Sequence, residues 1–319
     1  MVAQILSKPK PAVGVVSLDR LPGAGGWDGN LGRLITRAEQ EALALASAGV
    51  DALLLENAQD AYGVTRDRAE RLDPAAVSAM TRIAERLRQL TGCPLGIRAL
   101  PNDPLSALAI ALTVDAAFIC APVLIGARIT ESGMSAGALH ALREYRQRLL
   151  GAESIAIVAD VTMNHVVPTA QRMAPWRAPR AYLEQAALAT ARAGLADALL
   201  LQDLECAPED IDALRQTLSE AGFAPALWLT LNEPQMGDCQ REPDVAARLL
   251  ASVDGLVLAR EGLQKQGASE PIPVSGLACA ERQAPAVDPF RAESLAQALH
   301  AARTRVCAAS DRSEASALP

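Results

Sequence analysis

The chain has few aromatic residues and almost no lysine. Only 3% of its 319 residues are aromatic, although half are hydrophobic. A core of that composition must be built from Ala, Leu, Val and Ile, which suits helices packed on a parallel sheet. Lysine occurs only at Lys8, Lys10 and Lys265. Schiff-base and pyridoxal-phosphate enzymes need a desolvated lysine inside the fold. None of these positions offers one, so we expect neither chemistry.

Long apolar runs, paired cysteines and an excess of positive charge are also missing. No segment approaches the roughly 18 consecutive apolar residues of a transmembrane helix. The N-terminus lacks the basic segment followed by an apolar segment that marks a secretory signal. The six cysteines are scattered without a C-x-x-C pair, so we expect reduced thiols rather than disulfides or structural zinc. The net charge of −7 is the opposite of the basic excess that nucleic-acid-binding proteins show. We expect a cytoplasmic protein without nucleic-acid partners.

The sequence does contain a regular alternation of short apolar runs and longer amphipathic segments. Eight strands are predicted at 12–18, 51–56, 94–99, 116–120, 155–161, 197–201, 226–230 and 254–258. Eight helices are predicted at 32–48, 74–91, 103–113, 136–150, 178–193, 207–221, 241–251 and 289–304. This pattern fits a single α/β (β/α)₈ TIM barrel over residues 1–307 better than a doubly wound sheet. Residues 308–319 read as a disordered tail.

A repeated phrase supports the barrel. It reads GVDALLLEN at 49–57, TVDAAFICA at 113–121, LADALLLQD at 195–203 and SVDGLVLAR at 252–260. An aspartate therefore precedes every second strand, although the same joint also occurs in doubly wound sheets. The extended loops, at 19–31, 121–135, 162–177 and 259–287, all run from a strand to a helix. Such loops share the C-terminal face of a barrel, where functional sites are built.

Polar residues leave the predicted strands at that face, as an acidic set around His165. Asp160 and His165 are the candidates for acid–base catalysis. Oxygen and imidazole groups of this kind could instead hold a divalent cation. For Asp160 the structural alternative is a carboxylate that satisfies loop amides. The candidate ligand-binding residues are Glu56, Asn57, Asn102, Asp103, Gln202, Asp203, Asn232 and Arg260.

Ordered phrases over nearly the whole chain resemble the BtpA family, including its SgcQ-like members. VGVVSLDRLPG at 13–23 is similar to the family's opening strand and L-P-G loop. Glu56-Asn57 with Asp60 resembles its E-N-x-x-D motif, and LPNDPLSALAIA at 100–111 resembles a helix start of the family. The phrase FICAPVLIGARITESG at 118–133, the pair Asp160 and His165 in A-D-V-x-x-K-H, and V-D-P at 287–289 complete the resemblance.

Departures from the family pattern fall on the predicted rim. Ser17 stands where the family has histidine, Asn164 where it has lysine, and Gln202-Asp203 where it has Thr-Gly. The glycine turns after strands seven and eight are replaced by LNEP at 231–234 and by Ala259-Arg260. This distribution is expected of a divergent paralogue whose ligand changed or whose catalysis was lost.

The resemblance implies a barrel that binds a small polar ligand, such as a phosphorylated sugar or a nucleoside, at its C-terminal rim. Family members are linked to photosystem I biogenesis, so the alternative is a non-catalytic assembly factor that acts through protein partners. A homo-oligomer is also left open. A phosphosugar isomerase or lyase of ordinary barrel type is least favoured, because Glu233 and Glu261 would repel a phosphate at loops that usually bind it.

Overall fold

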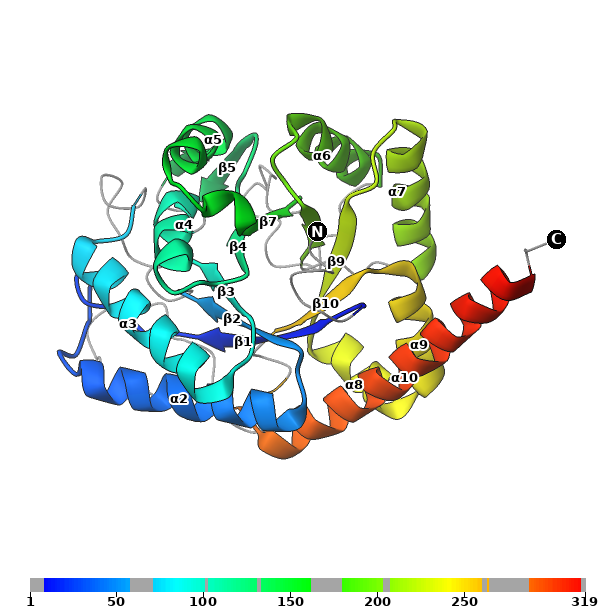
Figure 1. The fold of residues 1–319 in the computed structure, drawn as a ribbon, viewed down its shortest axis with the longest axis horizontal. Helices are drawn as coiled ribbons and strands as arrows, with labels where there is room; N and C mark the ends of the chain where they lie inside the picture. The colour runs from blue at the N-terminus through cyan, green and yellow to red at the C-terminus, as the bar shows by residue number, and fades with distance from the viewer. Residues whose placement is uncertain are drawn as a thin grey trace.

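The computed structural model describes residues 9–57, 71–100, 103–130, 133–161, 180–202, 207–259, 263 and 287–316. Eight parallel strands close into a barrel in the order β1-β10-β9-β8-β7-β4-β3-β2 (Figure 1). Every predicted strand is present, and the predicted TIM barrel is confirmed. The strands are β1 (Ala12–Ser17), β2 (Ala52–Glu56), β3 (Leu95–Arg98), β4 (Phe118–Ala121), β7 (Ala156–Asp160), β8 (Ala198–Leu201), β9 (Ala226–Leu231) and β10 (Gly255–Leu258).

The helices surround the strands on the outside of the barrel (Figure 1). They are α2 (Leu31–Ala48), α3 (Pro74–Thr91), α4 (Pro104–Thr113), α5 (Leu139–Arg148), α6 (Arg180–Ala193), α7 (Pro208–Glu220), α9 (Pro243–Ser252) and α10 (Pro289–Ser316). Four elements were not predicted: α8 (Glu233–Arg241), the antiparallel strands β5 (Ala127–Thr130) and β6 (Gly133–Ala136), and the short helix η2 (Ala152–Ser154). No helix within the described ranges is long and apolar enough to cross a membrane.

Helix α10 ends later than the sequence pattern predicts. The predicted end was residue 304, whereas the helix continues to Ser316. Figure 1 shows its last turns, in red, projecting beyond the barrel. The boundary between a barrel at 1–307 and a tail at 308–319 stays a prediction, but the backbone of residues 308–316 is helical.

Alternate residues of each strand face the inside of the barrel and pack into one cluster. This inner cluster consists of Val13, Val15, Ala52, Leu54, Phe118, Cys120, Ala156, Val158, Ala198, Leu200, Trp228 and Val257. The rings of Phe118 and Trp228 meet edge to face, with centroids 5.5 Å apart. Gly96 and Gly255 make room for them, because an added Cβ would lie 2.2 Å from the Phe118 ring and 2.8 Å from Trp228. The middle of the barrel is therefore filled, and the two aromatic rings form a floor below the C-terminal mouth.

The repeated aspartates lie at the opposite, N-terminal end of the strands, where they join neighbouring strands. Asp51 accepts a hydrogen bond from the backbone N–H of Ala12 at 2.9 Å. Asp197 and Asp254 accept equivalent bonds from Ile157 and Leu227, both at 2.9 Å. Asp115 differs, since it has a φ of 50° and contacts Arg88 at 3.2 Å. At three of its four positions the repeated phrase thus supplies a structural link between strands.

Replacing Asp197 with alanine is expected to lower the free energy of unfolding by about 1–3 kcal/mol, because the buried N–H of Ile157 loses its acceptor. The control is Asp115→Asn, since Asn tolerates a positive φ and the Asp115 side chain is 81% exposed. That change should stay within about 0.5 kcal/mol. Urea unfolding followed by circular dichroism measures both. Equal effects in the two variants would contradict the proposed link.

Candidate active site at the barrel mouth

Polar side chains replace apolar ones where the strands reach the C-terminal mouth. Residues i and i+2 of a strand point to the same side, so the residue two positions after a member of the inner cluster also faces inward. Applied to Val15, Leu54, Val158, Leu200 and Trp228, this rule gives Ser17, Glu56, Asp160, Gln202 and Thr230. Gly96 and Phe118 lead in the same way to Arg98 and Cys120. We call these seven residues the rim ring: Ser17, Glu56, Arg98, Cys120, Asp160, Gln202 and Thr230. Because all eight strands are parallel, the rim ring lies at one end of the barrel.

Arg98 ties one side of the rim ring together. Its Nη1 donates to Glu56 Oε1 at 2.8 Å, and its Nη2 donates to Cys120 Sγ at 3.1 Å. The Arg98 side chain is 8% exposed and that of Glu56 is 19% exposed. Burial lowers the pKa of Arg98, but Cys120 and Glu56 outweigh this effect, so the pKa is raised overall. The guanidinium is therefore a permanent cation with one carboxylate beside it.

Cys120 is held as a neutral thiol. Burial raises its pKa, and the charges of Asp160 and Glu56 act in the same direction, whereas Arg98 opposes them. Only a thiolate is an effective nucleophile. The rim ring thus contains a sulfur that accepts a hydrogen bond from Arg98, rather than an activated cysteine.

Cys120 should therefore resist iodoacetamide in the folded protein at pH 8. Cys239 should resist as well, because burial, followed by the charge of Asp238, raises its pKa to about 11. A raised pKa lowers the thiolate fraction at any pH below it, so both residues should react only after denaturation. Cys93 and Cys307, which are half-buried, serve as internal controls. Peptide mapping by mass spectrometry measures the labelling, and labelling of Cys120 at the rate of Cys93 would contradict the prediction.

Nε of Arg98 and Oγ1 of Thr230 are buried polar atoms of the rim ring without a hydrogen-bond partner in the described part of the structure. Their residues are 6% and 8% exposed. Their strands, β3 and β9, are four places apart in the closed ring of eight, so the two atoms belong to opposite walls. Leaving such a group unsatisfied costs about 1–3 kcal/mol, and native proteins contain few of them. A ligand or an ordered water between the two walls would satisfy both.

The structure brings together only some of the predicted site residues. Glu56, Asp160 and Gln202 are members of the rim ring. Asn57 is buried beside it, and its backbone N–H donates to the Arg98 carbonyl at 3.0 Å. The other predicted positions His165, Asn102, Asp203 and Arg260 lie outside the described residues.

Asp103 and Asn232 have structural roles. Asp103 caps α4, with Oδ1 accepting from the Ser106 amide at 3.1 Å and Oδ2 accepting from the Leu72 amide at 2.8 Å. Asn232 and Gln235 exchange side-chain to backbone bonds of 3.0 and 3.1 Å and begin α8. Since both oxygens of Asp103 and the side-chain oxygen of Asn232 are used in capping, we leave these two residues out of the proposed site.

The donors of the rim ring fit a divalent cation poorly. Within the described ranges, no three His, Cys, Asp or Glu side chains are grouped as metal ligands. The guanidinium of Arg98 already takes Oε1 of Glu56 and balances the charge of this carboxylate. A cation site that uses His165 and Asp203 stays a prediction.

The predicted ligand-binding residues did not include Arg98, Cys120, Ser17 or Thr230, although Arg98 and Thr230 are polar residues at the ends of predicted strands. The signal that could have found them is the two-residue period of the strands. Counting back from Glu56 and Asp160 places Leu54 and Val158 inside the barrel, and the same count on the other strands selects the missing residues.

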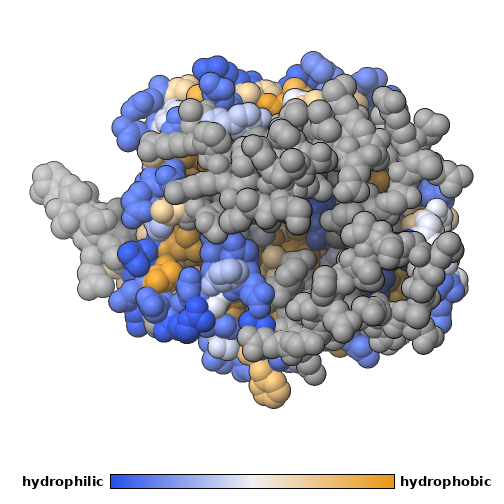
Figure 2. All heavy atoms as spheres, turned by 180° about the vertical axis from the view of Figure 1, so that it is seen from behind, coloured by the Kyte–Doolittle hydropathy of each residue, from blue (hydrophilic) through white to orange (hydrophobic). Residues whose placement is uncertain are grey.

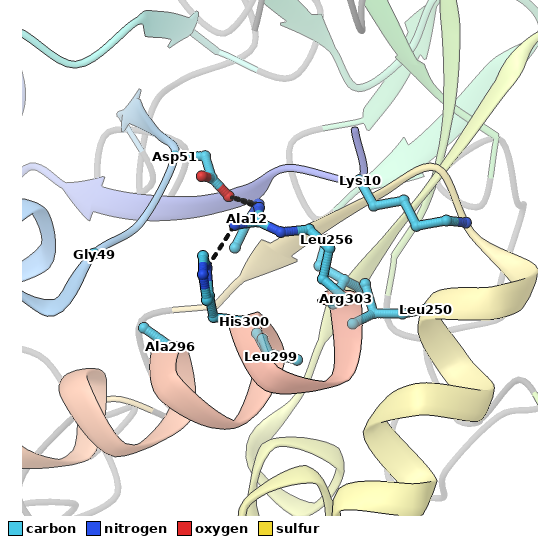
Figure 3. A pocket seen from close by; sticks show the side chains of 10 residues that line it. All are labelled: Lys10, Ala12, Gly49, Asp51, Leu250, Leu256, Ala296, Leu299, His300 and Arg303. Atoms are coloured by element: carbon cyan, nitrogen blue, oxygen red, sulfur yellow. Dashed lines mark hydrogen bonds and ion pairs between the residues drawn. The ribbon is translucent and has the colours of Figure 1, made fainter. Parts of the chain in front are cut away.

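A small pocket lies at the N-terminal end of the barrel (Figure 3). Arg303 on α10 donates to Asp51 at 2.7 Å and contacts Nδ1 of His300 at 2.7 Å. Lys10 donates to the carbonyl oxygens of Ala251 and Val253. The cavity measures about 10 Å³, which is room for a single water. These contacts fasten α10 and the first strand to the barrel and leave no space for a metabolite.

Comparison with known proteins agrees with this architecture. The photosystem I biogenesis protein BtpA of Synechocystis sp. is 36% identical over 277 residues, which cover 85% of this chain and 88% of that protein. Dihydropteroate synthase from Anaplasma phagocytophilum has a TM-score of 0.52 at 12% identity, covering 92% of this chain and 98% of that one. Rubisco from Pyrococcus horikoshii also has a TM-score of 0.52, at 16% identity, covering 95% and 60%. These two structures show the fold alone. The model of the BtpA family matches residues 8–224, and the chain therefore belongs to the BtpA family.

Proposed function

We propose that the chain binds a small polar metabolite in the C-terminal mouth of the barrel, over the rim ring. The observation that supports this most is the pair of buried atoms without a partner in the described structure. A ligand would satisfy Thr230 Oγ1 directly, and an ordered water bound with it would satisfy Arg98 Nε on the opposite wall. The aromatic floor of Phe118 and Trp228 closes the barrel below them, so a ligand would stop at the level of the rim ring. The ligand we propose is a phosphorylated sugar or a nucleoside, whose polar groups would meet the polar side chains of the rim ring.

Asp160 is the residue on which catalysis would depend. It ends β7 and is 1% exposed, and its charge acts on Cys120. In the proposal it serves as an acid–base or ligand-positioning carboxylate together with His165. Glu56 and Gln202 complete the polar contacts to the ligand.

A thermal-shift screen against sugar phosphates, nucleosides and divalent cations tests this function. Binding should raise the melting temperature in proportion to the logarithm of ligand concentration above Kd. The Asp160→Ala variant should lose that shift, while the control Asp115→Asn, at the other end of the barrel, should keep it. A shift that survives unchanged in Asp160→Ala, or a screen without any binder, would reject the proposal.

A second candidate function is photosystem I biogenesis through a protein partner. It is supported by the 36% identity to the Synechocystis protein of that name over 85% of this chain. Exposed apolar side chains at Leu150 on the α5–η2 connection and at Phe290 on α10 are available for contacts. Figure 2 shows small apolar areas separated by hydrophilic side chains among the coloured residues of one face. A homo-oligomer would use the same kind of surface.

Expression of the chain in a Synechocystis strain that lacks its own BtpA tests this second function. Restored photosystem I, measured from the absorbance change of its reaction-centre chlorophyll, would support it, and unrestored levels at equal expression would reject it. Asp160→Ala separates the two functions. A partner-based role should survive this substitution, whereas a ligand-based role should not.

A further inference from the structure

We propose that Glu56 is the group of the rim ring that contacts the ligand, that Arg98 positions Glu56, and that the ligand presents a neutral hydroxyl group to it. This inference rests on the proposed function and deepens it, since it names the chemical class of the ligand at one point of the site.

Glu56 is the more open partner of the ion pair. Its side chain is 19% exposed, against 8% for Arg98. The bond to Arg98 uses Oε1, and no residue in the described part of the chain bonds Oε2. Glu56 is the last residue of β2 and lies in register with Ser17 of β1 and Arg98 of β3. One carboxylate oxygen is thus fixed from the neighbouring strand β3, and the other is available to a molecule that enters the mouth.

The charges of the rim ring select the ligand. The rim ring has two carboxyl groups, those of Glu56 and Asp160, and one basic group, Arg98, which is already paired with Glu56. Cys120 is a neutral thiol because burial raises its pKa. A phosphate or carboxylate placed against Glu56 would meet a like charge with low solvent screening. A neutral group that donates a hydrogen bond avoids this repulsion.

A hydroxyl group suits both kinds of partner in the rim ring. It donates one hydrogen bond and accepts up to two. It can therefore donate to Oε2 of Glu56, while another hydroxyl of the same molecule accepts from Thr230 Oγ1, which has no partner in the described structure. Several hydroxyl groups on one carbon chain or ring can reach both walls, so the ligand part at this depth is a polyol or a sugar.

Arg98 acts through Glu56 rather than on the ligand. Its side chain is nearly buried, and Nη1 and Nη2 are used by Glu56 and Cys120. A charge-assisted bond of 2.8 Å fixes the rotamer of the carboxylate. Without Arg98, Glu56 would turn freely and would lose the orientation that Oε2 needs.

Isothermal titration calorimetry of the full chain with D-ribose, ribitol, myo-inositol and inorganic phosphate tests the inference. At least one polyol should bind. Glu56→Gln should weaken that binding about ten- to hundredfold, which is the usual effect of losing a charge-assisted hydrogen bond. Arg98→Met should weaken it to a similar extent, yet add nothing further in the Glu56→Gln background. Glu39→Gln, in the exposed pair of Glu39 and Arg86, is the matched control and should change nothing.

Four results would overturn the inference. Phosphate that binds the unaltered protein more tightly than every polyol would make the site an anion site, with the proposed function intact. Polyol binding that is lost in Asp160→Ala but unchanged in Glu56→Gln would remove Glu56 from the contact. A failure of every polyol to bind would reject the ligand class, and only the additional failure of the wider metabolite screen would reject the proposed function. Additive losses in the double variant would show that Arg98 is not a positioning residue.

Discussion

Replacement of Glu56 by leucine is expected to lower the free energy of unfolding by about 3–5 kcal/mol, the usual cost of removing one partner of a buried ion pair. Arg98 would remain 8% exposed without the carboxylate that balances its charge. The double variant Glu56→Leu, Arg98→Met should recover most of this loss, because it removes the unbalanced cation as well. Urea unfolding followed by circular dichroism measures the change as a shift of the midpoint at constant slope.

The control for this experiment is Glu39→Leu. The pair of Glu39 and Arg86 has a similar distance, 2.7 Å, but the Arg86 side chain is 57% exposed. Exposed pairs contribute about 0–1 kcal/mol. Two results would show that Glu56 does not hold Arg98 as described. One is a loss of unfolding free energy in Glu56→Leu no larger than that in Glu39→Leu, and the other is a double variant less stable than Glu56→Leu.

Gly96→Ala is the second change with a large expected effect. The added Cβ would lie 2.2 Å from Cε2 and Cζ of Phe118, and Phe118 cannot move away because it packs on Trp228. Forcing extra atoms into a filled core costs about 1–3 kcal/mol, and occasionally more. Differential scanning calorimetry should show a lower melting temperature, and Phe118→Leu in the same chain should restore part of it.

Gly25→Ala is the matched control, since no atom lies within 4 Å of the added Cβ. Its melting temperature should equal that of the unaltered protein. An unchanged melting temperature for Gly96→Ala would mean that the barrel interior is loose enough to take a methyl group. The ring pair could then not serve as a rigid floor.

The sequence predicted the scaffold well because the scaffold depends on local patterns. Each strand is a short apolar run, and each helix has an amphipathic period. Proline at the start of α3 and α4 follows an aspartate cap, and Gly49 and Gly92 end helices with φ values of 90° and 66°. These signals act within a few residues, so a single sequence contains them in full.

The unpredicted elements lack such signals or contain misleading ones. Helix α8 is short and polar, and it starts at LNEP, which reads as a turn; only the exchange of bonds between Asn232 and Gln235 makes it a helix start. Strands β5 and β6 have only four residues each, which is too short for a periodic pattern to stand out from the surrounding loop. Helix α10 continues past residue 304 without a glycine to end it.

Only part of the site was predicted. The search considered polar residues at strand ends and did not ask which residues of each strand point into the barrel. Glu56 and Asp160 are carboxylates at strand ends, so they were found. Arg98 and Cys120 also lie at or next to the ends of the strands predicted at 94–99 and 116–120, but their contact joins positions 22 residues apart, which no local pattern reveals. Asp103 looks like a site residue from its place after a strand, but only the structure shows that a remote amide, at Leu72, takes its second oxygen.

Closure of the barrel has a consequence for synthesis of the protein. Strand β1 pairs with β10, so that Ala12 lies beside Leu256, and the bond from Arg303 to Asp51 spans 252 residues. A nascent chain that has emerged only as far as residue 224 lacks β9 and β10, and its open sheet exposes the apolar edges of β1 and β8. Such edges recruit other chains, and pairings between remote segments form slowly. The ribosome must therefore release nearly the whole polypeptide before the ring can shut, and until then the growing chain depends on dilution or on chaperones to avoid aggregation.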